Sequence, residues 1–61
     1  MLKKFIAFDA HGTDCEPSKM TAIYKVVDDE GFPYDHVHIA KSIHDSEDDV
    51  AIDAALLAAI S

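Results

Sequence analysis

We predict that this chain folds as a minimal α/β domain, in which two strands form a small parallel sheet and two helices pack against it. Three observations predict this fold class. Apolar residues form two short strand-like runs, they recur at helical spacing in two longer runs, and the runs follow the order strand, helix, strand, helix. Two strands joined by a helical crossover pair in parallel, with a right-handed connection. The 61 residues are expected to make one domain, 1–61.

The first strand is expected over Lys3–Phe8. Phe5, Ile6 and Phe8 make a mostly apolar run there after two lysines. The following segment, Asp9–Pro17, contains a glycine and ends in a proline, so it is expected to be a loop.

The first helix is expected over Lys19–Glu30, with Ser18 as its N-cap and Gly31 as its C-terminal stop. Four apolar residues in this segment follow the i, i+3, i+4, i+7 spacing of one helix face. They are Met20, Ile23, Tyr24 and Val27.

The second strand is expected over His36–Lys41, because apolar and polar residues alternate there. Val37 and Ile39 point to one side of this strand, and two histidines point to the other. The next segment, Ser42–Asp45, is expected to be a loop that leads into the last helix.

The last helix is expected over Ser46–Ser61, with Ser46 as N-cap and Asp49 completing a capping box. The helix is apolar nearly all round, which is typical of a buried helix. One apolar side consists of Val50, Ala54 and Leu57. The other side, which we expect to form a homodimer interface, consists of Ile52, Leu56, Ala59 and Ile60. A two-stranded parallel sheet also leaves both edges open, so strand pairing across a two-fold axis is the alternative way to dimerise.

Charge excludes two classes of partner. The chain has 5 lysines, no arginine and 12 acidic residues, for a net charge of −7. Direct binding to nucleic acid needs cations, and an anionic membrane would repel this chain. The sequence shows no signal-peptide pattern and no transmembrane run, and Cys15 is the only cysteine, so we expect a cytoplasmic protein.

The leading functional hypothesis is a small acidic protein that binds another protein and has no catalytic role or cofactor. Its charge suits a basic partner, and acidic clusters can occupy a groove built for DNA or RNA. In size and charge it is similar to phage-encoded inhibitors of host enzymes and defence systems, including anti-CRISPR proteins. The expected contact residues are Asp28, Asp29, Glu30, Glu47 and Asp48, with Asp14, Glu16, Asp35 and Asp49 as further candidates.

The alternative hypothesis comes from two local motifs. The run Phe5–Thr13, FIAFDAHGT, resembles the first motif of the haloacid dehalogenase superfamily, and His44–Ile52 resembles its last motif. The resemblance implies a Mg²⁺-dependent phosphohydrolase, or an inactive relative that still binds Mg²⁺ and phosphate. Asp9 would be the nucleophile and a metal ligand, and Asp45 and Asp49 would hold the Mg²⁺ ion.

A third hypothesis is a structural or metal-sensing module. His36 and His38 lie on the same side of the expected strand, a spacing that can bind zinc or nickel. His11, His44 and Cys15 could complete such a site.

Overall fold

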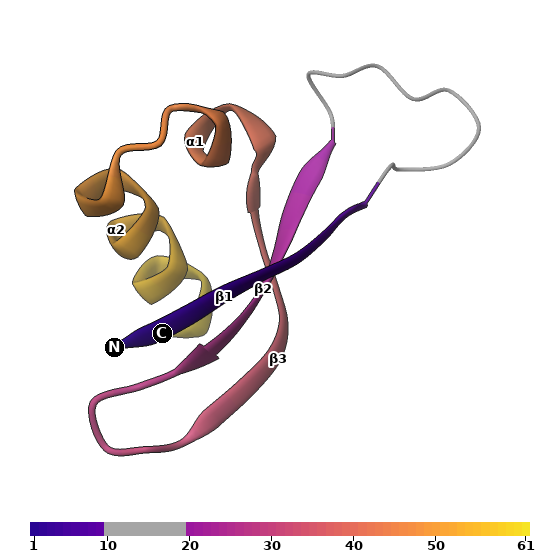
Figure 1. Cartoon of the computed structure of the whole chain (residues 1–61). Helices are drawn as coiled ribbons and strands as arrows, with labels where there is room; N and C mark the ends of the chain where they lie inside the picture. Colours follow the sequence, from indigo (N-terminus) through magenta and orange to yellow (C-terminus); the bar gives the residue numbers. More distant parts are fainter. Residues whose placement is uncertain (10–19) are drawn as a thin grey trace.

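The computed structural model describes residues 1–9 and 20–61 as a three-stranded antiparallel sheet with two helices on one face (Figure 1). The elements are β1 (Leu2–Asp9), β2 (Thr21–Val27), β3 (Pro33–Ala40), α1 (Lys41–Asp45) and α2 (Asp49–Ile60). The strand order is β1-β2-β3, so β2 is central. The expected parallel strand-helix-strand-helix unit is therefore wrong, because consecutive strands pair antiparallel.

The error lies in the segment Lys19–Glu30, which was expected to be a helix. Its described part contains β2, in which Ala22, Tyr24 and Val26 are buried on the helix side of the sheet. This period of two is the strand period. The segment is also rich in β-branched and aromatic residues, which pack well on a pleated surface. A tight β2–β3 hairpin takes the place of a helical crossover.

Gly31 serves that hairpin rather than a helix end. Its φ is +86°, and its amide donates to the carbonyl of Asp28 at 3.0 Å. The Asp28 carboxylate accepts hydrogen bonds from the amides of Glu30, at 3.0 Å, and Phe32, at 2.8 Å. Glycine adopts a positive φ without steric cost, and aspartate stabilises turns through such side-chain bonds.

Both of the expected strands are present. Lys3–Phe8 is contained in β1, and His36–Lys41 overlaps β3, which begins earlier, at Pro33. His36 interrupts the regular pairing of β3, because its φ is +58° and the register with β2 shifts beside it. The expected loop Ser42–Asp45 is wrong, since these residues belong to α1.

The helix expected over Ser46–Ser61 is confirmed as α2, but its first turn is different. The N-cap is Asp48, whose carboxylate accepts hydrogen bonds from the amides of Val50, at 3.1 Å, and Ala51, at 3.3 Å. Ser46 instead closes the end of α1, where its hydroxyl donates to a carbonyl oxygen at 2.6 Å. Aspartate is as good an N-cap as serine, so the sequence alone permitted either start.

The hydrophobic core lies between the helices and the β2–β3 part of the sheet. Within residues 1–9 and 20–61, its buried residues come from β2, β3 and α2: Ala22, Tyr24, Val26, Val37, Ile39, Ile52 and Leu56. Among the described residues, β1 contributes no fully buried side chain. β1 is therefore held in the sheet mainly by backbone pairing with β2, and less by burial of its side chains.

Candidate interaction surface

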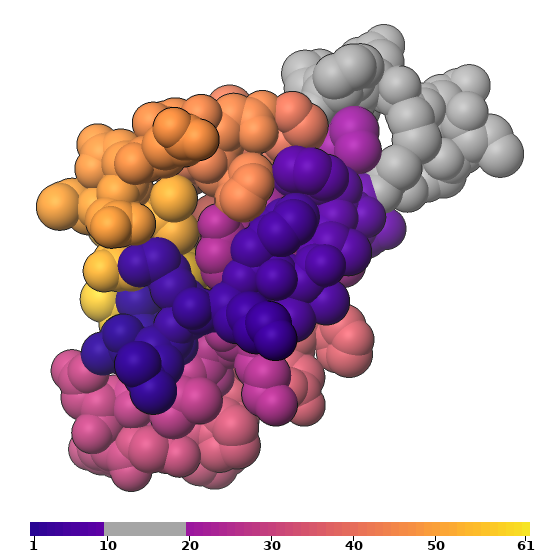
Figure 2. Space-filling view, in the orientation of Figure 1, coloured from indigo at the N-terminus to yellow at the C-terminus, as the bar shows by residue number. Residues whose placement is uncertain are grey.

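β1 forms an edge of the sheet, and its side chains are largely exposed. Leu2 is 72% exposed and Ile6 is 51% exposed, while Phe5 and Phe8 are each more than a third exposed. Figure 2 shows the strand, in indigo, lying uncovered across the front of the molecule. An edge strand presents unpaired backbone N–H and C=O groups, which another strand can pair with. β1 is thus an apolar surface with backbone groups suited to strand addition.

A β-bulge at Ile6 decides which side chains share a face of β1. Phe5 lies opposite Tyr24, and Phe8 lies opposite Ala22, although they are three residues apart. Directly opposed residues of an antiparallel pair point to the same face. Both phenylalanines therefore lie on the helix side, and their ring centroids are 5.0 Å apart.

The same bulge places Lys4 and Asp9 together on the open face of the sheet. Lys4 lies opposite Lys25, and Asp9 lies opposite Thr21. Like charges directly opposed across two strands destabilise the pair. Neither Lys4 nor Lys25 forms an ion pair with another described residue. Lys4 therefore carries a positive charge on this face that forms no ion pair in the described part of the chain.

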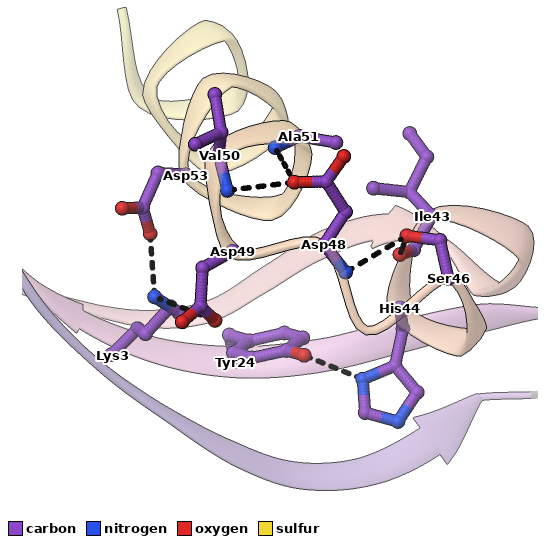
Figure 3. A network of polar contacts seen from close by, with 10 residues as sticks. All are labelled: Lys3, Tyr24, Ile43, His44, Ser46, Asp48, Asp49, Val50, Ala51 and Asp53. Carbon is purple, nitrogen blue, oxygen red and sulfur yellow. Dashed lines mark hydrogen bonds and ion pairs between the residues drawn. The ribbon is translucent and has the colours of Figure 1, made fainter.

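An aromatic cluster joins β1 to α1. The ring of His44 stacks on Phe5 with centroids 4.4 Å apart, and it meets the ring of Phe8 edge-on at 5.3 Å. The Tyr24 hydroxyl lies 2.5 Å from Nδ1 of His44 (Figure 3). Burial raises the pKa of Tyr24 above its ordinary value of 10.0. The cluster fixes one side of both phenylalanines and leaves the other side exposed at the sheet edge.

Lys3 ties the start of β1 to α2. Its ammonium group donates to Asp53 at 2.7 Å and lies 3.7 Å from Asp49 (Figure 3). The hydrogen bond to Asp53 raises the pKa of Lys3 above its ordinary value of 10.5, and the negative charges of Asp53 and Asp49 add to the shift. β1 is thus held to the helix layer by a salt bridge and by the His44 contacts.

The acidic residues expected to contact a partner lie in two turns. In the β2–β3 turn, Asp28 is engaged in the turn hydrogen bonds, and Asp29 accepts a hydrogen bond from the Met1 amino group at 2.6 Å. That bond lowers the pKa of Asp29 below its ordinary value of 3.8. Glu30 is exposed, and its carboxylate makes no ion pair with a described residue.

The second turn connects α1 and α2. Asp48 is the N-cap of α2, so its carboxylate is used within the fold. Glu47 is exposed, and its φ of +55° turns the chain between the two helices. Of the five leading contact residues, Glu30 and Glu47 are thus the two whose carboxylates form no hydrogen bond or ion pair with a described residue, and the further candidate Asp35 is likewise exposed.

The three acids of the phosphohydrolase hypothesis have separate partners. Asp9 lies 3.8 Å from Nδ1 of His38, Asp45 pairs with Lys41, and Asp49 approaches Lys3. In residues 1–9 and 20–61, no three His, Cys, Asp or Glu side chains are grouped to hold a metal ion. The rest of the first motif, with His11, lies outside the described residues. Magnesium-dependent catalysis by Asp9 stays a prediction, tested by loss of phosphoester turnover in Asp9→Asn.

The histidines do not form the expected pair on one regular strand. The bulge at His36 removes it from the regular alternation, whereas His38 lies opposite Ile23 on the open face. Nδ1 of His38 lies 2.9 Å from the Thr21 hydroxyl. Asp9 approaches this same ring nitrogen, so the three residues lack the arrangement of a catalytic triad, which uses both nitrogens. His11 and Cys15 lie outside the described residues, and zinc or nickel binding stays a prediction.

The helix side expected to form a dimer interface is largely occupied within one chain. Ile52 and Leu56 are buried against the sheet, so they are core residues and cannot also contact a second copy. Ile60 packs partly against the same core, and Ala59 is exposed beside a shallow open hollow along β3. The physical reason is that the antiparallel sheet offers an apolar face wide enough to cover this side of α2.

The sequence reasoning missed the edge of β1. A signal for it was present, since Lys4-Phe5-Ile6-Ala7-Phe8-Asp9 has opposite charges at its ends and phenylalanines next to them. The symmetry of this run becomes apparent only with the bulge at Ile6, which places Phe5 and Phe8 on one face of β1 and Lys4 and Asp9 on the other.

Comparison with protein-family models, curated proteins and solved structures found no match to this chain. In the described part of the chain, neither helix has the length and apolar character needed to cross a membrane.

Proposed function

We propose that this chain acts by binding another protein, and that its exposed carboxylates engage a basic surface of that partner. The supporting observation is that both acidic turns are held in place by hydrogen bonds while Glu30 and Glu47 remain exposed. Carboxylates in ordered positions lose less conformational entropy on binding than those on mobile segments. The net charge of −7 would also speed association with a cationic partner.

The partner class that fits best is a nucleic-acid-binding protein whose groove is lined with lysine or arginine. Such a groove is built to neutralise closely spaced phosphates, and an acidic surface can occupy it instead. The outcome would be competitive inhibition of nucleic-acid binding. We place this encounter in the cytoplasm, in keeping with a chain that has a single cysteine.

The test uses charge reversal at positions that the fold does not need. The double variant Glu30→Lys, Glu47→Lys should keep its circular-dichroism spectrum. Asp28→Lys and Asp48→Lys would instead damage a turn and a helix cap. The tagged parent chain would be used to capture a partner from cells, and the captured protein would be assayed for nucleic-acid binding.

Three results together would support the proposal. The parent chain releases nucleic acid from the captured protein, the double variant does not, and the isosteric variant Glu30→Gln, Glu47→Gln has an intermediate effect. Added salt should weaken the competition, because exposed charges are screened. A captured protein that holds its nucleic acid normally, or one that the reversal variant binds equally well, would refute this function.

A further inference from the structure

We infer that β1 pairs antiparallel with β1 of a second copy of this chain, so that the two sheets join into one across a two-fold axis. The surface is the open edge of the sheet, where four apolar side chains are exposed: Leu2, Phe5, Ile6 and Phe8. This inference does not depend on the proposed basic partner, and it is measured without one.

The charge pattern of β1 fits a second copy of itself. An antiparallel alignment centred between Ile6 and Ala7 places Lys4 opposite Asp9 of the second copy. It also places Phe5 opposite Phe8 of the second copy, and two-fold symmetry makes each pair occur twice. Opposite charges and aromatic pairs are favourable cross-strand partners.

The bulge makes this alignment sterically consistent. In a regular strand, Phe5 and Phe8 would point to opposite faces, and they could not be cross-strand partners about a two-fold axis normal to the sheet. The extra residue at Ile6 puts both on the helix side and puts Lys4 and Asp9 on the open side. Each proposed pair therefore has both members on the same face of the joined sheet.

A second charge relation favours the same partner. Lys4 lies opposite Lys25 within one chain, and no described carboxylate neutralises either lysine. In the joined sheet, Asp9 of the second copy would lie beside Lys4 on the side away from Lys25. The dimer would offset the cross-strand pairing of two like charges that each separate copy contains.

The lysine also restricts the register. Sliding the second copy by two residues places Lys4 opposite Ala7 and Asp9 opposite Leu2, so neither charge has an opposite charge across from it. Lysines on edge strands usually prevent indiscriminate pairing. Here Lys4 permits pairing in the one alignment that places a carboxylate of β1 opposite it, which yields a closed dimer rather than a fibre.

The test is sedimentation equilibrium of the purified chain from micromolar to millimolar concentration. The parent should form dimers. Lys4→Glu or Asp9→Lys should each raise the dissociation constant about tenfold or more, because two attractive pairs become repulsive. The double variant Lys4→Glu, Asp9→Lys keeps the net charge and should restore dimerisation. Asp35→Lys, on the opposite edge strand, changes net charge as Asp9→Lys does and should not weaken the dimer.

Three outcomes would overturn the inference. The parent is monomeric throughout, the single variants dimerise as well as the parent, or the folded double variant fails to recover. Circular dichroism establishes that each variant is folded. If a reversal unfolds the chain, Lys4→Gln and Asp9→Asn replace it, and each should still weaken the dimer.

Discussion

The two edge strands of this sheet are built differently, although both flank the same central strand. β3 begins with Pro33, carries an exposed Asp35, and is bent by the left-handed residue His36. These are features that keep other strands from pairing with an edge. β3 also supplies core residues, and both helices pack on it.

β1 has the opposite character. It has no proline, its exposed residues are mostly apolar, and it meets the helices through Lys3 and the two phenylalanines. The difference teaches that burial and edge protection are concentrated on one side of this small fold. The other side is left available for association.

The largest expected effect concerns the helix that covers β3. Leu56 is fully buried against the sheet, whereas Leu57 is 51% exposed on the same helix. Leu56→Ala should lower the free energy of unfolding by about 2–5 kcal/mol, because it removes core contacts and leaves a cavity. Leu57→Ala should change it by no more than about 0.5 kcal/mol. Urea unfolding followed by circular dichroism measures both, and equal losses would contradict the assigned orientation of α2.

A smaller loss is expected at the start of the same helix. Asp48→Ala removes the carboxylate that caps the first turn of α2 and should cost about 1 kcal/mol of unfolding free energy. Glu47→Ala, one residue earlier, removes an exposed carboxylate that makes no cap bond and serves as the matched control. Thermal unfolding of the two variants compares them directly. A greater loss in Glu47→Ala would place the N-cap elsewhere.

The hydrogen bond between Tyr24 of β2 and His44 of α1 is expected to contribute a similar or slightly smaller amount to the free energy of unfolding. Tyr24→Phe removes the hydroxyl that lies 2.5 Å from His44 and keeps the buried ring. Loss of one hydrogen bond of this kind should cost about 0.5–1.5 kcal/mol. Chemical shifts of Phe5 and Phe8 should move as His44 is released. Unchanged stability together with unchanged shifts would show that the bond does not hold the cluster.

The smallest effect is the pH dependence of the tie between Lys3 and α2. Because the folded state raises the pKa of Lys3, the stabilisation is fully present below the ordinary value of 10.5 and is lost as the pH rises through the higher folded value. Lys3→Gln should therefore have a lower melting temperature than the parent at neutral pH. This difference in melting temperature, the gap, should close above about pH 10.5. Asp53→Asn should behave alike. A gap that stays constant into the alkaline range would rule out this ion pair as its source.

The sequence predicts the ends of this fold better than its middle. β1 and α2 are confirmed because each has one consistent signal: an apolar run after lysines, and a capped run of alanine and leucine. β2 was mistaken for a helix because it is apolar on both faces. Ile23 and Val27 lie on the open face while Tyr24 is buried on the other, so a two-sided strand mimics helical spacing.

Gly31 also favoured the wrong prediction of a helix, because a glycine with positive φ can end a helix or close a hairpin equally well. The β-branched content of Thr21–Val27 was the signal that could have decided between the two. The expectation of a dimer interface on the last helix followed from this same error. Ile52 and Leu56 look available only if no sheet face covers them, and the bulge that sorts the side chains of β1 onto its two faces is seen only in the antiparallel pairing with β2.

The most direct test of the contrast between the edges is an isotope-filtered NMR experiment on a mixture of labelled and unlabelled chains. Contacts between copies should join the ring protons of Phe5 in one chain to those of Phe8 in the other, with none from β3. Contacts between copies that involve β3, or Val50 and Leu57 of α2, would contradict the account. So would the absence of any contact between copies at β1.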